Sequence, residues 1–349
     1  MNSKKDIRAL TLEQLQEFFI TNGEQKFRAK QVMDWLWKNS ATSFDQMNNV
    51  SKKMREALEQ NFVINAVIVD TKQVSSDHTI KNAFRLYDGN IVEGVLIPTE
   101  NRMTACVSSQ VGCSLTCKFC ATGRLERLRN LNADEIYDQV ALIKKQAEDH
   151  YNIPLTNIVY MGMGEPLLNY SNVLKSIEHI TSPEGLNMAA KRITVSTAGI
   201  AKMIKKLGDD DVRFNLALSL HAANDKKRDQ IMPINEHNNL EALREALKYF
   251  YDKTGTPVTY EYIVFNNFND SPEDAYELWQ FAKNIPCKIN LIEYNPIEGG
   301  TFVNAKEDKI DAFKNYLEHK GLIVNVRRSR GKDIDAACGQ LANKSVKTV

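Results

Sequence analysis

From about residue 104 onward, short apolar runs typical of strands alternate with amphipathic stretches typical of helices. The strand-like runs lie at 105–108, 158–161, 193–196, 214–220, 258–264 and 289–294. Helical patterns separate them, for example at 133–146, 172–180, 240–251 and 272–284. Strands separated by helices form parallel β-α-β units, and six such units fall short of the eight that close a barrel. The sequence therefore predicts an α/β fold built on a partial (β/α)6 barrel, whose gap would admit a large substrate.

The region before these units predicts a small helical domain followed by a hairpin. Apolar residues at helical spacing follow Thr11, a candidate N-cap, and Trp37 continues the same spacing as a packing residue. Further on, Asp88 and Gly89 separate two strand-like runs, which is a hairpin signal, and Pro98 closes the second run. We therefore expect a helical docking domain at 1–65 and a β-hairpin linker at 66–98. A core at 99–332 and a C-terminal loop at 333–349 would follow.

Composition limits the class of protein. The chain has 349 residues, 43% of them hydrophobic, which is enough for a large core. Lys plus Arg number 45 and Asp plus Glu 44, so the net charge of +1 gives no global signature of nucleic-acid binding. No apolar run is long enough to span a bilayer, and the polar start lacks the apolar core of a signal peptide. We expect a cytoplasmic protein, in which the six cysteines serve metal binding or catalysis rather than structural disulfides.

Cys113, Cys117 and Cys120 lie in one Cys-x3-Cys-x2-Cys run. Three thiolates on a short loop can bind three irons of one [4Fe-4S] cluster and leave the fourth iron without a protein ligand. An open iron is a place where a small molecule can be chelated and reduced. Two alternatives are a structural zinc site that recruits Cys106, and a Cys-x-x-Cys redox pair that would not need the third cysteine. The spacing, and the lack of a second Cys/His knuckle in the sequence, favour the iron–sulfur site.

Polar and glycine residues follow the ends of the predicted strands, where parallel α/β proteins collect their reactive groups. In Met-Gly-Met-Gly-Glu-Pro, Gly164 would let the backbone approach a ligand closely, and Glu165 could accept hydrogen bonds from an ammonium group. Later strand ends carry Ser196, then Ser219, Leu220 and His221, and then Asn295. Each alone also fits an ordinary turn, cap or structural role. Together they predict a pocket for a polar adenosyl ligand.

The three cysteines outside the run differ in their surroundings. Cys338 lies among small residues near the C-terminus, which suits a mobile or closely approached loop, although a buried apolar cysteine fits the same pattern. Cys106 lies on the predicted strand that leads into the cysteine loop, so it can lie near the site. Cys287 stands at a strand entry and is assigned no chemistry.

Four motifs, at 112–120, 162–166, 219–221 and 333–341, together resemble the RlmN/Cfr family of radical S-adenosylmethionine (SAM) RNA methyltransferases. The likeness runs from about residue 8 to residue 342 and implies a radical SAM barrel with a [4Fe-4S] cluster and bound SAM. RlmN-type members methylate C2 of one adenosine in 23S rRNA and of the adenosine beside the anticodon of certain tRNAs. The sister type methylates C8. The residues look more like the first type; the C8 alternative stays open, as does a zinc-stapled RNA-binding protein without chemistry.

The resemblance also implies roles for single residues. Cys338 takes a methyl group from one SAM as a thiolate nucleophile. A second SAM, bound to the open iron and split to a 5′-deoxyadenosyl radical, removes hydrogen from that methyl group, and the resulting methylene radical adds to C2. Glu93 matches the family's acceptor of the C2 proton, although from the residues alone it is interpreted as a solvated surface residue. Cys106 then attacks the Cys338 sulfur and leaves a Cys106–Cys338 disulfide; two cysteines far apart in sequence suit such a resolving pair.

The expected partners follow from the same resemblance. They are 23S rRNA and tRNA as substrates and a flavodoxin or ferredoxin as reducing partner, with no membrane and a monomeric chain. The N-terminal helical domain is one candidate RNA contact. Basic residues that flank the proposed site are candidate phosphate contacts: Arg124, Arg127, Arg129, Arg327, Arg328, Arg330 and Lys332.

Overall fold

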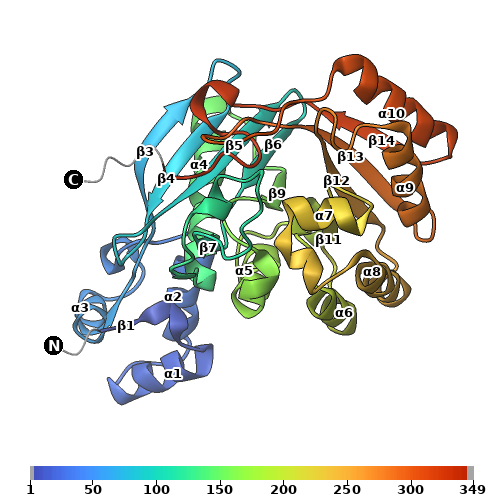
Figure 1. The fold of residues 1–349 in the computed structure, drawn as a ribbon. Helices are drawn as coiled ribbons and strands as arrows, with labels where there is room; N and C mark the ends of the chain where they lie inside the picture. The colour runs from blue at the N-terminus through green and yellow to red at the C-terminus, as the bar shows by residue number, and fades with distance from the viewer. Residues whose placement is uncertain (1–3, 344–349) are drawn as a thin grey trace.

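The computed structural model describes residues 4–343, and the ends of the first and last predicted parts, 1–3 and 344–349, lie outside the described residues. The described residues form a ten-stranded sheet in the spatial order β14-β13-β12-β11-β10-β9-β6-β5-β4-β3 (Figure 1). Its strands are β3 (Ile68–Val74), β4 (Ile80–Arg85), β5 (Ile91–Thr99), β6 (Arg102–Cys106), β9 (Asn157–Tyr160), β10 (Ile193–Thr197), β11 (Asn215–Ser219), β12 (Val258–Val264), β13 (Cys287–Glu293) and β14 (Ile323–Arg327).

The half of the sheet from β6 to β14 is parallel, and its strands follow one another in space as they do in sequence. Each predicted strand-like run lies at one of these strands, which confirms the α/β class. β14 was not predicted; it pairs in parallel with β13 and extends the partial barrel. The intervening helices are α4 (Ala133–Tyr151), α5 (Tyr170–Thr181), α6 (Ala201–Asp209), α7 (Asp225–Ile231), α8 (Leu240–Thr254), α9 (Pro272–Ala282) and α10 (Glu307–His319).

The helices pack on the sheet through apolar residues at helical spacing, as α4 illustrates. It begins at a capping box on Asn132, ends where Asn152 adopts φ of 52°, and buries Ile136, Val140 and Ile143. Each such burial contributes roughly 1.5–3 kcal/mol, so this row fixes α4 against β5 and β6. Within residues 4–343, no helix combines the length and the apolar character needed to cross a membrane.

The other half of the sheet is antiparallel. The predicted hairpin forms between β4 and β5, with Gly89 in its turn at φ of 83°. β5 then runs through Pro98 to Thr99 and pairs with β6. β3, β4 and β5 are therefore continuous with the parallel strands, and one end of the barrel wall is antiparallel.

The N-terminal helices α1 (Leu12–Thr21), α2 (Arg28–Trp37) and α3 (Lys52–Asn61) pack below this sheet, in blue in Figure 1. Thr11 caps α1 as predicted. Trp37 is buried as predicted: it meets Tyr137 of α4 edge-on, with ring centroids 5.2 Å apart, and stacks on His179 of α5 at 3.7 Å. The aromatic contacts join the N-terminal helices to the barrel helices.

Arg8 adds buried charge to the same interface. The residue is 5% exposed, and its guanidinium lies 3.3, 3.0 and 2.9 Å from the carboxylates of Asp6, Asp134 and Asp138. Burial alone would lower the pKa of Arg8, but the carboxylates raise it above the ordinary value. Asp134 and Asp138 belong to α4, so this cluster fastens the start of the chain to the barrel.

Candidate active site

The loop that carries the three cysteines leaves the carboxyl end of β6. A short antiparallel pair, β7 (Gln110–Val111) and β8 (Arg129–Asn130), folds it back on itself. Gly112 lies beside this pair at φ of 75°, and a Cβ there would come within 1.9 Å of the carbonyl oxygen of Glu126. Glycine is required at this position because both the conformation and the close approach exclude a side chain.

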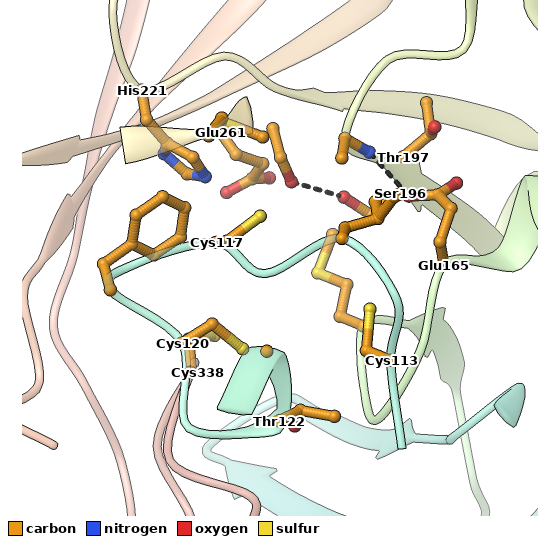
Figure 2. Close-up of a pocket in the computed structure, with 18 of the residues that line it drawn as sticks. Cys113, Cys117, Cys120, Thr122, Glu165, Ser196, Thr197, His221, Glu261 and Cys338 are labelled. Atoms are coloured by element: carbon orange, nitrogen blue, oxygen red, sulfur yellow. Dashed lines mark hydrogen bonds between the residues drawn. The ribbon is translucent and has the colours of Figure 1, made fainter. Parts of the chain in front are cut away.

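Cys113, Cys117 and Cys120 line one cavity, and Figure 2 shows them spaced around the loop. No set of three or more Cys, His, Asp or Glu side chains in the described part of the chain has the arrangement of a single-ion site. In a [4Fe-4S] cluster each thiolate binds a different iron, so thiols spaced around a loop fit such a cluster. Burial raises the pKa of all three thiols, that of Cys113 to about 11, so metal binding must drive their deprotonation.

The carboxyl ends of three parallel strands form the opposite wall. The predicted residues that line the cavity there are Gly164, Glu165, Ser196, Ser219 and His221. Glu165 is already partly used: its Oε2 accepts the N–H of Ala198 at 2.8 Å, and its Oε1 accepts that of Leu167 at 3.0 Å. Burial raises the pKa of Glu165. The hydroxyls of Ser196 and Ser219 lie 3.2 Å apart and share a hydrogen bond.

His221 and two further predicted residues are held in different ways. Burial, with the charge of Arg228, lowers the pKa of His221 to about 3, so its ring is neutral. Leu220 is fully buried and does not line this cavity. Asn295 does not line it either; its Nδ2 donates to the carbonyl oxygen of Cys338 at 3.1 Å. Contacts from Leu220 and Asn295 to a ligand stay predictions.

Arg228 is a residue of this site that the sequence analysis missed. It is fully buried on α7 and donates hydrogen bonds to the carbonyl oxygens of Ala198 at 2.5 Å, Leu220 at 3.1 Å and Ser219 at 3.3 Å. It therefore ties the ends of β10 and β11 together beneath the cavity. In the sequence it stands in a run of charged residues that is typical of a solvated helix, so no local pattern marks it.

Residues 331–343, which we call the C-terminal strap, run from β14 to β4 and β5 and bring Cys338 to the cavity (Figures 1 and 2). The strap was predicted as a loop, and its described part has little regular structure beyond one short 3-10 turn. Hydrogen bonds from the cysteine loop hold it: Ala121 N–H to the Gly339 oxygen at 2.7 Å, and Thr122 Oγ1 to the Leu341 oxygen at 2.6 Å.

Cys338 also lines a second cavity of about 720 Å³ inside the barrel, which it shares with Cys106. Cys338 is exposed, whereas Cys106 is buried, and burial raises the pKa of Cys106 to about 12. Cys338 is accessible from the cavities, but the surrounding protein still desolvates its thiol and raises its pKa. The guanidinium of Arg327 opposes this rise. The two cysteines are free and border one common space.

Glu93 lies under the strap rather than at a surface. It is 1% exposed and lines neither cavity. Its Oε2 accepts the N–H groups of Ala342 at 2.8 Å and Asn343 at 3.1 Å, and its Oε1 lies 3.5 Å from Nζ of Lys81. The interpretation of Glu93 as a solvated residue is wrong, because the strap covers it.

Most of the basic residues that flank the site are engaged within the chain. The contacts are Arg124 with the carbonyl oxygens of Glu298 and Gly299, Arg129 with Asp88 and Glu135, Arg327 with Glu261, Arg328 with Glu293 and Glu307, and Lys332 with Glu293. A phosphate at these residues would have to compete with a carboxylate or a carbonyl oxygen. Their role as phosphate contacts stays a prediction.

Two family models match the chain. Residues 5–64 match the ribosomal RNA large subunit methyltransferase N-terminal domain, and residues 107–278 match the radical SAM superfamily. The first match covers the N-terminal helices, and the second begins just before the cysteine loop and includes the strand ends that line the cavity.

Relatives match over nearly the whole chain. A probable dual-specificity RNA methyltransferase RlmN of Cytophaga hutchinsonii is 66% identical over 344 residues, which cover 99% of this chain and 94% of the relative. A dual-specificity RNA methyltransferase RlmN of Geotalea uraniireducens is 43% identical, with 99% of each chain covered. The crystal structure of a radical SAM methyltransferase from Sphaerobacter thermophilus matches with a TM-score of 0.91 and 37% identity, over 97% of this chain and 99% of that one. The chain therefore belongs to the RlmN family of radical SAM methyltransferases.

Proposed function

We propose that this chain methylates C2 of adenosine in 23S rRNA and in tRNA. The observation that carries the proposal is the position of Cys338, a free and exposed thiol on the strap, in the wall of the cavity that the three-cysteine loop encloses. C2 of adenine is an amidine carbon and too poor a nucleophile to take a methyl group directly from SAM. A protein thiol that accepts the methyl group first, next to a source of radicals, overcomes this difficulty.

The cavity suits the two cofactors that the radical SAM family uses. Cys113, Cys117 and Cys120 would bind a [4Fe-4S] cluster as thiolates. When bound, the cluster supplies the electron that cleaves SAM to a 5′-deoxyadenosyl radical, which takes hydrogen from a methyl group. The residues that would hold SAM are Gly164, Glu165, Ser196, Ser219, Leu220, His221 and Asn295. Buried Glu165 and neutral His221 offer hydrogen-bonding groups without solvent competition.

The cysteines and Glu93 have distinct roles in this proposal. The Cys338 thiolate attacks the methyl carbon of one SAM, releases S-adenosylhomocysteine and carries the methyl group. Once the carbon of that group is bonded to C2, the adduct would give up its odd electron to an oxidant such as the oxidised cluster, and Glu93 accepts the C2 proton. The Cys106 sulfur then loses its proton and attacks the Cys338 sulfur. The attack forms a sulfur–sulfur bond and breaks the sulfur–carbon bond, and the released carbon takes up a proton, which completes the methyl group and frees the methylated RNA. An external reductant must then reopen the Cys106–Cys338 disulfide.

The proposal extends to partners and domains. Electrons would come from a flavodoxin or ferredoxin, and the chain would act as a monomer. Residues 1–65 would dock RNA, and residues 66–98 would link this domain to a core at 99–332. The loop from residue 333 onward would carry the methyl-accepting cysteine.

Mass spectrometry of nucleosides tests the reaction. Ribosomal RNA and tRNA from cells that lack the chain are compared with those from cells complemented with the wild type. We expect 2-methyladenosine to be absent from the RNA of cells that lack the chain and to return in the RNA of complemented cells. Loss of 8-methyladenosine instead would assign the chain to the C8 reaction, and unchanged nucleosides would contradict both.

A further inference from the structure

Lys81 is a buried lysine that the proposed reaction does not use. It lies on β4 with 4% of its surface exposed, and its Nζ is 3.5 Å from Oε1 of Glu93. Burying an ammonium group is costly unless an opposite charge lies close by. The pair therefore places a fixed cation beside the group that accepts the C2 proton.

The strand register puts Lys81 on the same face as the reacting groups. Val95 of β5 pairs with Lys81 of β4 on one side and with Cys106 of β6 on the other. Residues directly opposite one another share a face of the sheet, and Glu93, two residues before Val95, faces the same way. The other face of β4 packs on α4. Lys81, Glu93 and Cys106 therefore lie together on the face that the strap covers.

The two oxygens of Glu93 have different surroundings. Oε2 accepts the two strap amides of Ala342 and Asn343. Oε1 is buried and accepts no hydrogen bond from the described residues, and Lys81 lies beside it. Oε1 thus keeps a free lone pair next to a cation. The Cys106 thiol on the same face is neutral, because burial raises its pKa to about 12, so the charge that faces Glu93 comes from Lys81.

We infer that Lys81 is a positioning residue that holds Oε1 of Glu93 in place for proton transfer. The inference rests on the proposed function. In the step concerned, the C2–H bond breaks while an O–H bond forms on Oε1, and the electron pair stays on the adenine ring. Oε1 accepts no hydrogen bond from the described residues, so the Lys81 ammonium is the group that orients it. Loss of Lys81 therefore slows proton removal and leaves methyl transfer to Cys338 intact.

The test separates these two stages in the full-length, cluster-loaded enzyme. Lys81→Met and Lys81→Gln remove the charge, Lys81→Arg keeps it, and Lys72→Met on neighbouring β3 is the matched control, because Lys72 is exposed. The measurements are S-methylation of Cys338, turnover on RNA, and the kinetic isotope effect with deuterium at C2 of the target adenosine. The Gln variant retains polar character and carries the test if the Met variant does not fold.

We expect the neutral variants to methylate Cys338 within about twofold of wild type, to turn over RNA at least ~10-fold more slowly and to show a larger isotope effect. Arginine restores most of the rate. A neutral variant with wild-type turnover, or one with slow turnover but an unchanged isotope effect, overturns the inference. Failure of the wild type itself to form 2-methyladenosine would instead overturn the proposed function.

Discussion

The N-terminal helices and the C-terminal strap both attach to the barrel, and the contacts that hold them differ in kind. The N-terminal helices are joined by the aromatic contacts of Trp37 and by Arg8, which is buried among carboxylates. The strap is held by separate hydrogen bonds, such as those from Thr122 to Leu341 and from Ala342 to Glu93. One attachment is an interface with packed aromatic rings and buried charge. The other combines separate hydrogen bonds with the burial of a few apolar side chains, Ala336, Ala337 and Leu341.

This difference matches what each region has to do. A packed interface with buried charge is lost only at a large cost, so the N-terminal helices stay fixed relative to the barrel. A single hydrogen bond contributes about 0.5–1.5 kcal/mol net, so a strap held in this way can exchange partners locally. In the proposed reaction Cys338 meets SAM, RNA and Cys106 in turn, and a weakly held strap allows this.

Removing the thiol of the strap has the largest expected effect on function and the smallest on folding. We expect Cys338→Ala to abolish RNA methylation while the unfolding temperature stays that of the wild type, because the side chain is exposed. Nucleoside analysis and calorimetry measure the two quantities. Cys287→Ala is the control and keeps full activity. Residual methylation by the Cys338 variant would show that another residue carries the methyl group.

Removing the resolving cysteine is expected to stop the reaction one step later. Cys106→Ala leaves the Cys338–RNA adduct without an attacking thiol, so a covalent complex accumulates. Denaturing gels with labelled RNA detect it, and Cys338→Ala provides the control without a complex. A gel of the Cys106 variant that shows no crosslink after incubation with SAM and reductant contradicts this role.

Arg8→Met tests how the N-terminal helices, the other region of the comparison, are attached to the barrel. The change leaves three carboxylates near one another without their cation, so we expect the free energy of unfolding to fall by roughly 3–5 kcal/mol. Chemical denaturation measures this loss, with exposed Lys52→Met as control. S-methylation of Cys338 by the folded fraction remains normal. A loss below about 1 kcal/mol would mean that the interface does not depend on buried charge.

The N-terminal interface also predicts a dependence on pH. Burial, with the charges of Lys175 and Arg8, lowers the pKa of His179 from 6.5 to about 4. Folding is therefore opposed once the unfolded chain binds a proton at His179 that the folded chain does not. The free energy of unfolding is highest above pH 6.5 and falls by about 2–3 kcal/mol in all as the pH drops toward 4. Comparing His179→Phe with wild type across this window isolates the contribution, since the phenylalanine ring can still stack on Trp37 but does not titrate. Parallel pH profiles would contradict it.

The smallest effect concerns a single contact of the strap. Thr122→Val removes the hydrogen bond to the Leu341 oxygen at a net cost of about 1 kcal/mol. Hydrogen exchange at the amides of Ala342 and Asn343 becomes faster, while amides in α2 are unaffected. Thr122→Ser keeps the hydroxyl and preserves protection. Faster exchange spread over the whole protein would indicate global destabilisation instead of a local release of the strap.

The sequence predicted what depends on local patterns. Alternating apolar runs gave the parallel strands, and the cysteine spacing indicated a metal-binding loop. β14 was missed because Asn325 interrupts a short apolar run, and its pairing with β13 is a tertiary contact. The predicted Gly164, Glu165, Ser196, Ser219 and His221 do line one cavity, because parallel strands end at a common edge.

Contacts between distant segments could not be predicted from local patterns. Ala342 donates to Glu93 across 249 residues of sequence, and no periodicity encodes that contact. Lys81 and Arg228 are charged residues in polar or mixed surroundings, where exposure is the usual outcome. Only the three-dimensional arrangement shows that both are buried.

Iron spectroscopy of the anaerobically isolated protein, with and without SAM, is the most direct test of the central claim. We expect one [4Fe-4S] cluster per chain, with a single iron whose signal changes when SAM is added, and loss of the cluster in Cys117→Ala. A cluster with four cysteine ligands that does not respond to SAM, or zinc in place of iron, would contradict the account.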